Sequence, residues 1–150
     1  MNGSLLLVVA LLAASPDQTA KDTAQGLLTQ GAALFDKHDA ALMAATYMDE
    51  GEIRLFVKQQ NEPGYKVESR KGRTAIQEGY VDVFKNATPS MRARNVVESA
   101  ELLGDHTMII KGTFQPDLNK ADVVHFVQVR VKDGGAWKIL NMDLFALPQN

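Results

Sequence analysis

The spacing of apolar residues is helical in the first part of the chain. Ser15 is placed to cap a helix and Pro16 to occupy its first position. Apolar or small residues then recur at the three- and four-residue intervals of one helix face, at Ala24, Leu27, Leu28, Gly31, Leu34 and Phe35. Asp39 is placed to cap a second, shorter helix, "AALMAATYM", which consists largely of strong helix formers and ends before Gly51.

A strand and a third helix follow. The stretch "EIRLFVK" alternates apolar and polar residues, which predicts a half-buried first strand. Residues 59–72 contain Pro63, two glycines and several basic residues, and indicate a loop or an irregular strand. In "GRTAIQEGYVDVFKNA", Thr74 and Gln77 are spaced as a capping box, so a third helix is expected there.

From Pro89 onward the pattern becomes that of long strands. These are "SMRARNVVESAELL", "HTMIIKGTF", "DVVHFVQVRV" and "GGAWKILNMDLFALP", and glycine-containing turns separate the first two and the last two. Helices first and an antiparallel meander afterwards make an α+β layout.

The first twenty residues, "MNGSLLLVVALLAASPDQTA", contain an apolar run from Leu5 to Ala14. The run is too short for a membrane-spanning helix, which needs about 20 apolar residues, but it suits a signal peptide, although no basic residue precedes it. We therefore expect a secreted or periplasmic protein with residues 1–19 as leader, cleavage between Ala13 and Ala20, and no membrane span in the mature chain. The alternative is an apolar leader that stays attached as a packed helix or a membrane tether. Residues 20–147 then form one domain.

Composition narrows the classes of function. The 150 residues include 16 basic and 18 acidic side chains, for a net charge of −2, so no nucleic-acid partner is expected. There is no cysteine, and the three histidines, His38, His106 and His125, lie far apart without helical spacing. No metal site is expected. Phosphate-binding loops and nucleophile elbows are missing as well, so no cofactor is expected.

Three segments, taken in order, resemble the nuclear transport factor 2-like (NTF2-like) superfamily and, within it, the SnoaL-like branch. They are "AATYMDEGEI", "GRTAIQEGY" and "GGAWKILNMDLF", and the resemblance covers residues 20 to 147. It implies a cone-shaped fold, in which three N-terminal helices pack in a curved antiparallel sheet around an apolar cavity. It also implies a homodimer through the outer sheet face. Isomerases, dehydratases, cyclases, hydrolases and non-catalytic members share this fold, so the resemblance assigns no activity.

The register of the last hairpin decides which residues face the cavity. A two-residue turn at Gly134 and Gly135 pairs Asp133 with Ala136, Val129 with Leu140, Val127 with Met142 and His125 with Leu144. That register places Leu140, Met142 and Leu144 inside and Asp143 outside. A three-residue loop would instead place His125 opposite Asp143. We favour the first register, because burying about three aliphatic side chains is worth about 1.5–3 kcal/mol each and an exposed ion pair at most about 1 kcal/mol.

The leading hypothesis is a protein that binds a small, largely apolar molecule in its cone cavity, with no catalysis assigned. The expected cavity wall includes Tyr47, Tyr80, Phe84, His125, Met142 and Leu144. His125 is either a neutral histidine bonded to a hydroxyl, such as that of Tyr47 or Tyr80, or a general base. The carboxylates that ketosteroid-isomerase-like members use are missing from "LFVKQQ" and from the position of Val127.

Two alternatives remain open. One is an isomerase-, dehydratase- or cyclase-type enzyme with His125 as general base and a tyrosine hydroxyl as acid. The other is a dimeric protein-interaction module, whose mixed outer face centres on Trp137, Arg130 and Phe126.

Overall fold

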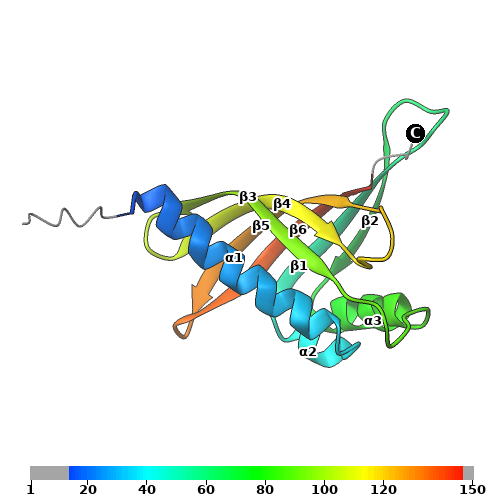
Figure 1. Ribbon diagram of the computed structural model, residues 1–150, viewed down its shortest axis with the longest axis horizontal. Coiled ribbons are helices and arrows are strands. Elements are labelled where there is room, and N and C mark those ends of the chain that lie inside the picture. The colour runs from blue at the N-terminus through cyan, green and yellow to red at the C-terminus, as the bar shows by residue number, and fades with distance from the viewer. Residues whose placement is uncertain (1–13, 147–150) are drawn as a thin grey trace, which may run out of the picture.

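The computed structural model describes residues 14–146, so most of the expected leader lies outside the described residues. The elements along the chain are α1 (Pro16–Phe35), α2 (Ala40–Ala44), β1 (Tyr47–Lys58), β2 (Tyr65–Lys71), α3 (Arg73–Phe84), β3 (Arg94–Leu103), β4 (Thr107–Gln115), β5 (Val124–Asp133) and β6 (Ala136–Ala146) (Figure 1). The expected α+β class is confirmed. No helix within this part of the chain is long and apolar enough to cross a membrane.

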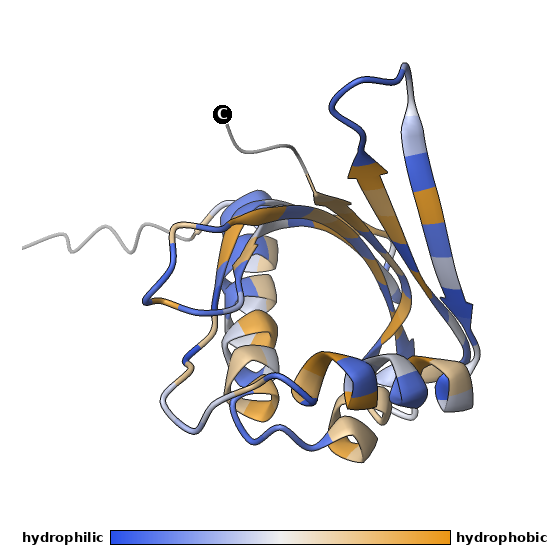
Figure 2. Ribbon diagram, turned by 90° about the vertical axis from the view of Figure 1, so that its right-hand side faces the viewer, coloured by the Kyte–Doolittle hydropathy of each residue, from blue (hydrophilic) through white to orange (hydrophobic). Residues whose placement is uncertain are grey.

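The strands form one sheet in the order β2-β1-β6-β5-β4-β3, which curves around the three helices on its concave side (Figure 2). Neighbouring strands pair antiparallel except β1 and β6, which are parallel. The chain between them, through β2, α3 and the meander, is long enough for the crossover that a parallel pair requires.

Helix α1 begins as its sequence predicts, since the Ser15 side chain accepts a hydrogen bond from the Gln18 amide. Asp39 caps α2 through the Leu42 amide at 3.0 Å. The predicted second helix is too long, however, because α2 ends at Ala44 and Tyr47 already pairs with Ile139 of β6. Strand pairing outweighs the helix propensity of this segment.

The segment before α3 also differs from its prediction. Residues Tyr65–Lys71 form a regular strand that pairs with β1. Gly72, with a φ of 85°, occupies the N-cap of α3, and no side chain caps the helix there. The predicted capping box of Thr74 and Gln77 is therefore wrong. Glycine suits this position because positive φ carries no Cβ penalty.

Helix α1 is fastened to the edge of the sheet by amide side chains. Gln25 donates to the Asn95 carbonyl at 3.1 Å and accepts from the Val97 amide at 2.9 Å. Asn95 in turn donates to the Leu28 carbonyl at 2.9 Å. These bonds satisfy backbone groups that an edge strand leaves unpaired.

The core consists of two clusters. In the first, Ala20, Ala24 and Leu28 of α1 contact β3, β4 and β5. In the second, Tyr47 and Ile139 pack with α2 and α3. Small side chains let the N-terminal half of α1 lie close to the sheet, whereas its last two turns line a cavity between the clusters.

The last hairpin has the predicted turn but not the predicted register. Asp133 pairs with Ala136, and Gly134 and Gly135 have φ values of 55° and 83°, as a type I′ turn requires. The register then shifts at Leu140, because Arg130 pairs with Ile139 and Val129 with Asn141. One bulged residue thus moves every later pair by one.

Because of this bulge, the side of β5 that faces the cavity is the opposite of the one that the expected register places there. His125 pairs with Phe145 and Val127 with Asp143, instead of the expected Leu144 and Met142. Phe126, Gln128 and Arg130 are the buried alternate residues of β5, and His125 is exposed. The placement of His125, Val127 and Val129 inside is therefore wrong, because a one-residue shift sends side chains to the opposite face.

On β6, two of the three residues that were expected inside reach the cavity. Met142 and Leu144 line the cavity, and Leu140, the bulged residue, does not. Asp143 lies on the convex face, where it pairs with Arg54 of the neighbouring strand.

Candidate functional site

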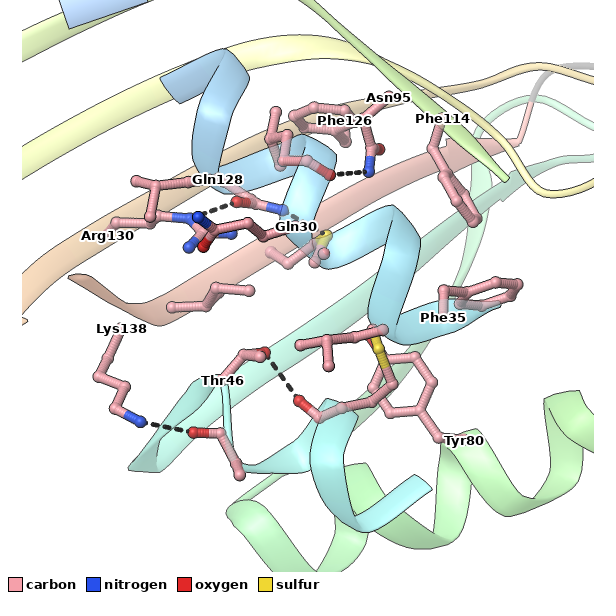
Figure 3. Close-up of a pocket in the computed structure, with 18 of the residues that line it drawn as sticks. Gln30, Phe35, Thr46, Tyr80, Asn95, Phe114, Phe126, Gln128, Arg130 and Lys138 are labelled. Atoms are coloured by element: carbon pink, nitrogen blue, oxygen red, sulfur yellow. Dashed lines mark hydrogen bonds between the residues drawn. The ribbon is translucent and has the colours of Figure 1, made fainter. Parts of the chain in front are cut away.

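A cavity of about 460 Å³ lies between the helices and the concave face of the sheet (Figure 3). Its wall is mostly aliphatic and aromatic, with contributions from α1, α2, α3 and the strands β3, β4, β5 and β6. The volume is within the range of small-molecule pockets, about 300–1,000 Å³. The apolar residues of the wall include Leu27, Leu34, Phe35, Met43, Val83, Phe114, Phe126, Trp137, Ile139, Met142 and Leu144.

Three polar side chains of the wall, those of Thr46, Asn95 and Lys138, are bonded to backbone carbonyls. Thr46 donates to the Met43 carbonyl at 2.7 Å and Lys138 to the Ala45 carbonyl at 2.7 Å. Asn95 donates to α1, as described above. These hydrogen bonds stabilise the wall of the cavity.

Arg130 is the charged residue set deepest in the wall, with only 5% of its surface exposed. Its Nε donates to the Gln128 Oε1 atom at 2.9 Å, and no carboxylate of the described residues forms an ion pair with it. Residues 1–13 and 147–150 contain no Asp or Glu. Burial lowers the pKa of the Arg130 guanidinium to about 10, so it is still charged at neutral pH.

Gln128, 3% exposed, takes its orientation from Arg130. Because a guanidinium has no acceptor, the amide must turn Oε1 toward Nε, and Nε2 then donates to the Met142 sulfur at 3.3 Å. A thioether is a weak acceptor. The buried amide therefore keeps a donor that a better acceptor in the cavity would attract.

The charges of the wall have one sign. Arg130 and Lys138 line the cavity, and none of the described residues that line it is Asp or Glu. The ion pairs found within residues 14–146 lie on the surface or the convex face instead. The cavity is thus electropositive in a chain whose net charge is −2.

Two tyrosines lie at the end of the cavity nearest α3. The hydroxyls of Tyr47 and Tyr80 are 3.0 Å apart, and Tyr80 lines the cavity. Desolvation by burial raises the pKa of both phenols. Both are therefore neutral at pH 7 and supply hydroxyl dipoles rather than negative charge near Arg130.

The structure brings three of the six residues expected in the wall to the cavity, namely Tyr80, Met142 and Leu144. Tyr47, fully buried, lies behind Tyr80. Phe84 stacks on Tyr80 with ring centroids 5.9 Å apart and supports the wall without lining it. His125 is exposed on the opposite side of β5.

These positions correct the residues on which the two alternative hypotheses rested. An enzyme with His125 as general base needs that imidazole at the cavity, and it is outside. The interaction surface centred on Trp137, Arg130 and Phe126 does not exist either, because all three side chains line the cavity.

Arg130 and Gln128 are the site residues that the sequence interpretation missed. Their signal was present as the alternation of Phe126, Gln128 and Arg130 along β5. The valines at the intervening positions made the opposite face look like the core.

The convex face has its own arrangement around Asp143. Arg54 Nε and Nη2 donate to the two carboxylate oxygens of Asp143 at 2.8 and 2.7 Å. Beside this pair the rings of Phe56 and Phe145 stack with centroids 5.0 Å apart. Among the described residues no group of three His, Asp or Glu side chains is placed to hold a metal ion.

No family model and no curated protein matches the chain. Solved structures are similar to it. One is a domain of unknown function with a cystatin-like fold from Nostoc punctiforme, with 12% identity, a TM-score of 0.65 and coverage of 87% of this chain and 79% of that chain. Another is an NTF2-like protein of unknown function from Shewanella oneidensis, with 13% identity, a TM-score of 0.64 and coverage of 83% and 97%.

A third is an NTF2-like protein with a cystatin-like fold from Novosphingobium aromaticivorans, with 12% identity, a TM-score of 0.57 and coverage of 89% and 85%. At such identities the similarity establishes the fold, while the SnoaL-like branch stays a prediction. The element order, the curved sheet and these structures together show that the chain has the NTF2-like, or cystatin-like, fold.

Proposed function

We propose that this protein binds one small, largely apolar molecule in its cavity and does not transform it. The observation that carries the proposal is the cavity itself, about 460 Å³ with a mostly apolar wall and a few polar groups at defined places. Sites of this kind typically enclose small ligands. Secretion or a periplasmic location is part of the proposal and rests on the N-terminal sequence alone.

The chemistry of the wall favours binding over catalysis. A general base needs an unprotonated group within reach of the substrate. Within the described residues the wall has no carboxylate and no histidine, and the raised pKa of Tyr80 keeps its hydroxyl protonated. Lys138 is engaged with the Ala45 carbonyl.

The test uses N-phenyl-1-naphthylamine, a neutral dye whose fluorescence rises in apolar surroundings. We expect saturable binding with one dye per chain. Two glycines of α1 offer a matched pair of variants, because a Cβ added at Gly26 or at Gly31 meets nothing within 4 Å. Only Gly31 lines the cavity.

We therefore expect G31F, which places a ring in the cavity, to weaken dye binding at least tenfold. G26F changes the same helix on its exposed side and is expected to leave the affinity within twofold. A dye that does not bind, or that binds equally to both variants, would exclude an accessible apolar cavity as the site.

We also propose that the convex face pairs with a second copy of the chain. In the described part of the molecule the helices lie on the concave side (Figure 2). The exchanged register places Val127 and Val129 on the convex side, together with the stacked Phe56 and Phe145. Aromatic and aliphatic side chains at the centre of an uncovered sheet face are typical of homodimer interfaces.

A further inference from the structure

We infer that the molecule held in the cavity carries a carboxylate group, which pairs with the guanidinium of Arg130. This inference rests on the proposed function and adds the chemical class of the ligand. It starts from a cation that is almost completely buried at the cavity wall and has no anion beside it among residues 14–146.

A buried charge in a folded protein normally has an opposite charge or a metal as partner. Neither exists for Arg130 in the described residues, and the acidic side chains of the chain all lie within that part. The neighbouring phenols of Tyr47 and Tyr80 are neutral. No acidic side chain of the chain therefore supplies the missing partner, and we assign that role to the ligand.

The free edge of the guanidinium fits a planar anion. Gln128 fixes Arg130 through Nε, and the two Nη groups have no other hydrogen bond to the described residues. Two parallel N–H groups match the two oxygens of a carboxylate in the bidentate geometry that arginine prefers.

A carboxylate fits this site better than a phosphate. A phosphate monoester carries nearly two negative charges and three acceptor oxygens. The cavity offers one deeply buried guanidinium, whereas its other cation, Lys138, is only half-buried, so that solvent screens its charge. One negative charge balances the buried cation.

The rest of the ligand is apolar and includes an aromatic or branched group. Figure 3 shows Arg130, Gln128 and Lys138 on one side of the cavity and Phe35 and Phe114 on the other. Phe126 and Arg130 lie four residues apart on β5, roughly 13 Å at the rise of a strand. An aryl group joined to the carboxylate by a short alkyl chain directs its ring from Arg130 toward the aromatic side of the wall.

The experiment compares 4-phenylbutanoate with 4-phenylbutanamide, which has nearly the same shape without the charge. Trp137, the only tryptophan of the chain, lines the cavity and reports binding directly by fluorescence titration at pH 7.5. We expect the acid to bind wild-type protein at least tenfold more tightly than the amide. R130M and R130Q should abolish this preference, whereas R94M, which removes an exposed arginine, should retain it.

Equal affinities for the acid and the amide, binding of neither, or a preference that persists in both Arg130 variants would each overturn the inference. The dye titration is separate, because the dye has no charge. Dye binding without an acid preference leaves the proposed cavity function intact, while absence of dye binding removes the proposed function itself. Circular dichroism spectra like that of wild type establish that each variant is folded.

Discussion

Replacing Arg130 by methionine is expected to stabilise the empty protein. The perturbation removes a cation that is 5% exposed and keeps most of the side-chain volume. Burial lowers the pKa of Arg130 to about 10, and each pKa unit corresponds to about 1.4 kcal/mol, so the buried charge costs the folded state about 3 kcal/mol at neutral pH. Residues that bind a ligand often carry such a cost in stability.

Part of this gain is lost at Gln128. Its Oε1 atom accepts the Arg130 Nε hydrogen bond and would be left buried without a donor, which costs about 1–2 kcal/mol. The net stabilisation expected is about 1–2 kcal/mol, or a rise in Tm of roughly 3–6 °C for a chain of this size. R94M, at an exposed arginine, should stay within about 0.5 kcal/mol of wild type.

The pH dependence of the stability difference between R130M and wild type provides a second test. The folded-state pKa of Arg130 is below its unfolded value, so the cost is fully present below pH 10. Above that pH the folded state releases the proton before the unfolded state does, and wild-type stability recovers part of the difference. The advantage of R130M should therefore be constant near neutral pH and narrow above about pH 10.

The assay is urea unfolding followed by circular dichroism, on protein that was first unfolded and refolded to remove any bound molecule. A loss of 1 kcal/mol or more in R130M would refute the reasoning. It would mean that Arg130 is a satisfied structural residue and not a cation awaiting an external anion.

Two further predictions concern the sheet. In G112A the added Cβ would meet the Val96 carbonyl oxygen and approach the Phe126 ring to 3.0 Å. We therefore expect the free energy of unfolding, measured in urea, to fall by about 2–3 kcal/mol. An unchanged unfolding midpoint would contradict this packing. In F145D the stack on Phe56 is replaced by a charge, and light scattering coupled to size exclusion should show the mass falling from that of two chains to that of one. A wild-type protein that is monomeric at micromolar concentration would exclude the proposed homodimer.

Elements fixed by neighbours in sequence could be predicted well. Ser15, Pro16 and the apolar stripe define α1, and Gly134 with Gly135 defines the tight turn of the last hairpin. Each of these depends on interactions within a few residues. The α+β order follows from the same local patterns.

Predictions that depended on distant partners failed more often. Tyr47 lies in a good helix-forming segment, yet it joins β1 because Ile139, 92 positions away, pairs with it. His125 was placed inside because the valines beside it look like core residues, and the bulge at Leu140 reverses their faces.

The sequence by itself therefore determined the α+β class, the caps of α1 and α2 and the last turn, because these follow from short-range hydrogen bonding and backbone preferences. Only the tertiary structure decided that Arg130 and Gln128 face the cavity while His125 and the valines face outward. Both sets of alternate residues on β5 include apolar side chains. Which set faces the cavity therefore depends on where β6 bulges and on which side of the sheet the helices cover. The buried face of β5 thus depends on pairing with another strand, and the local sequence of β5 does not reveal it.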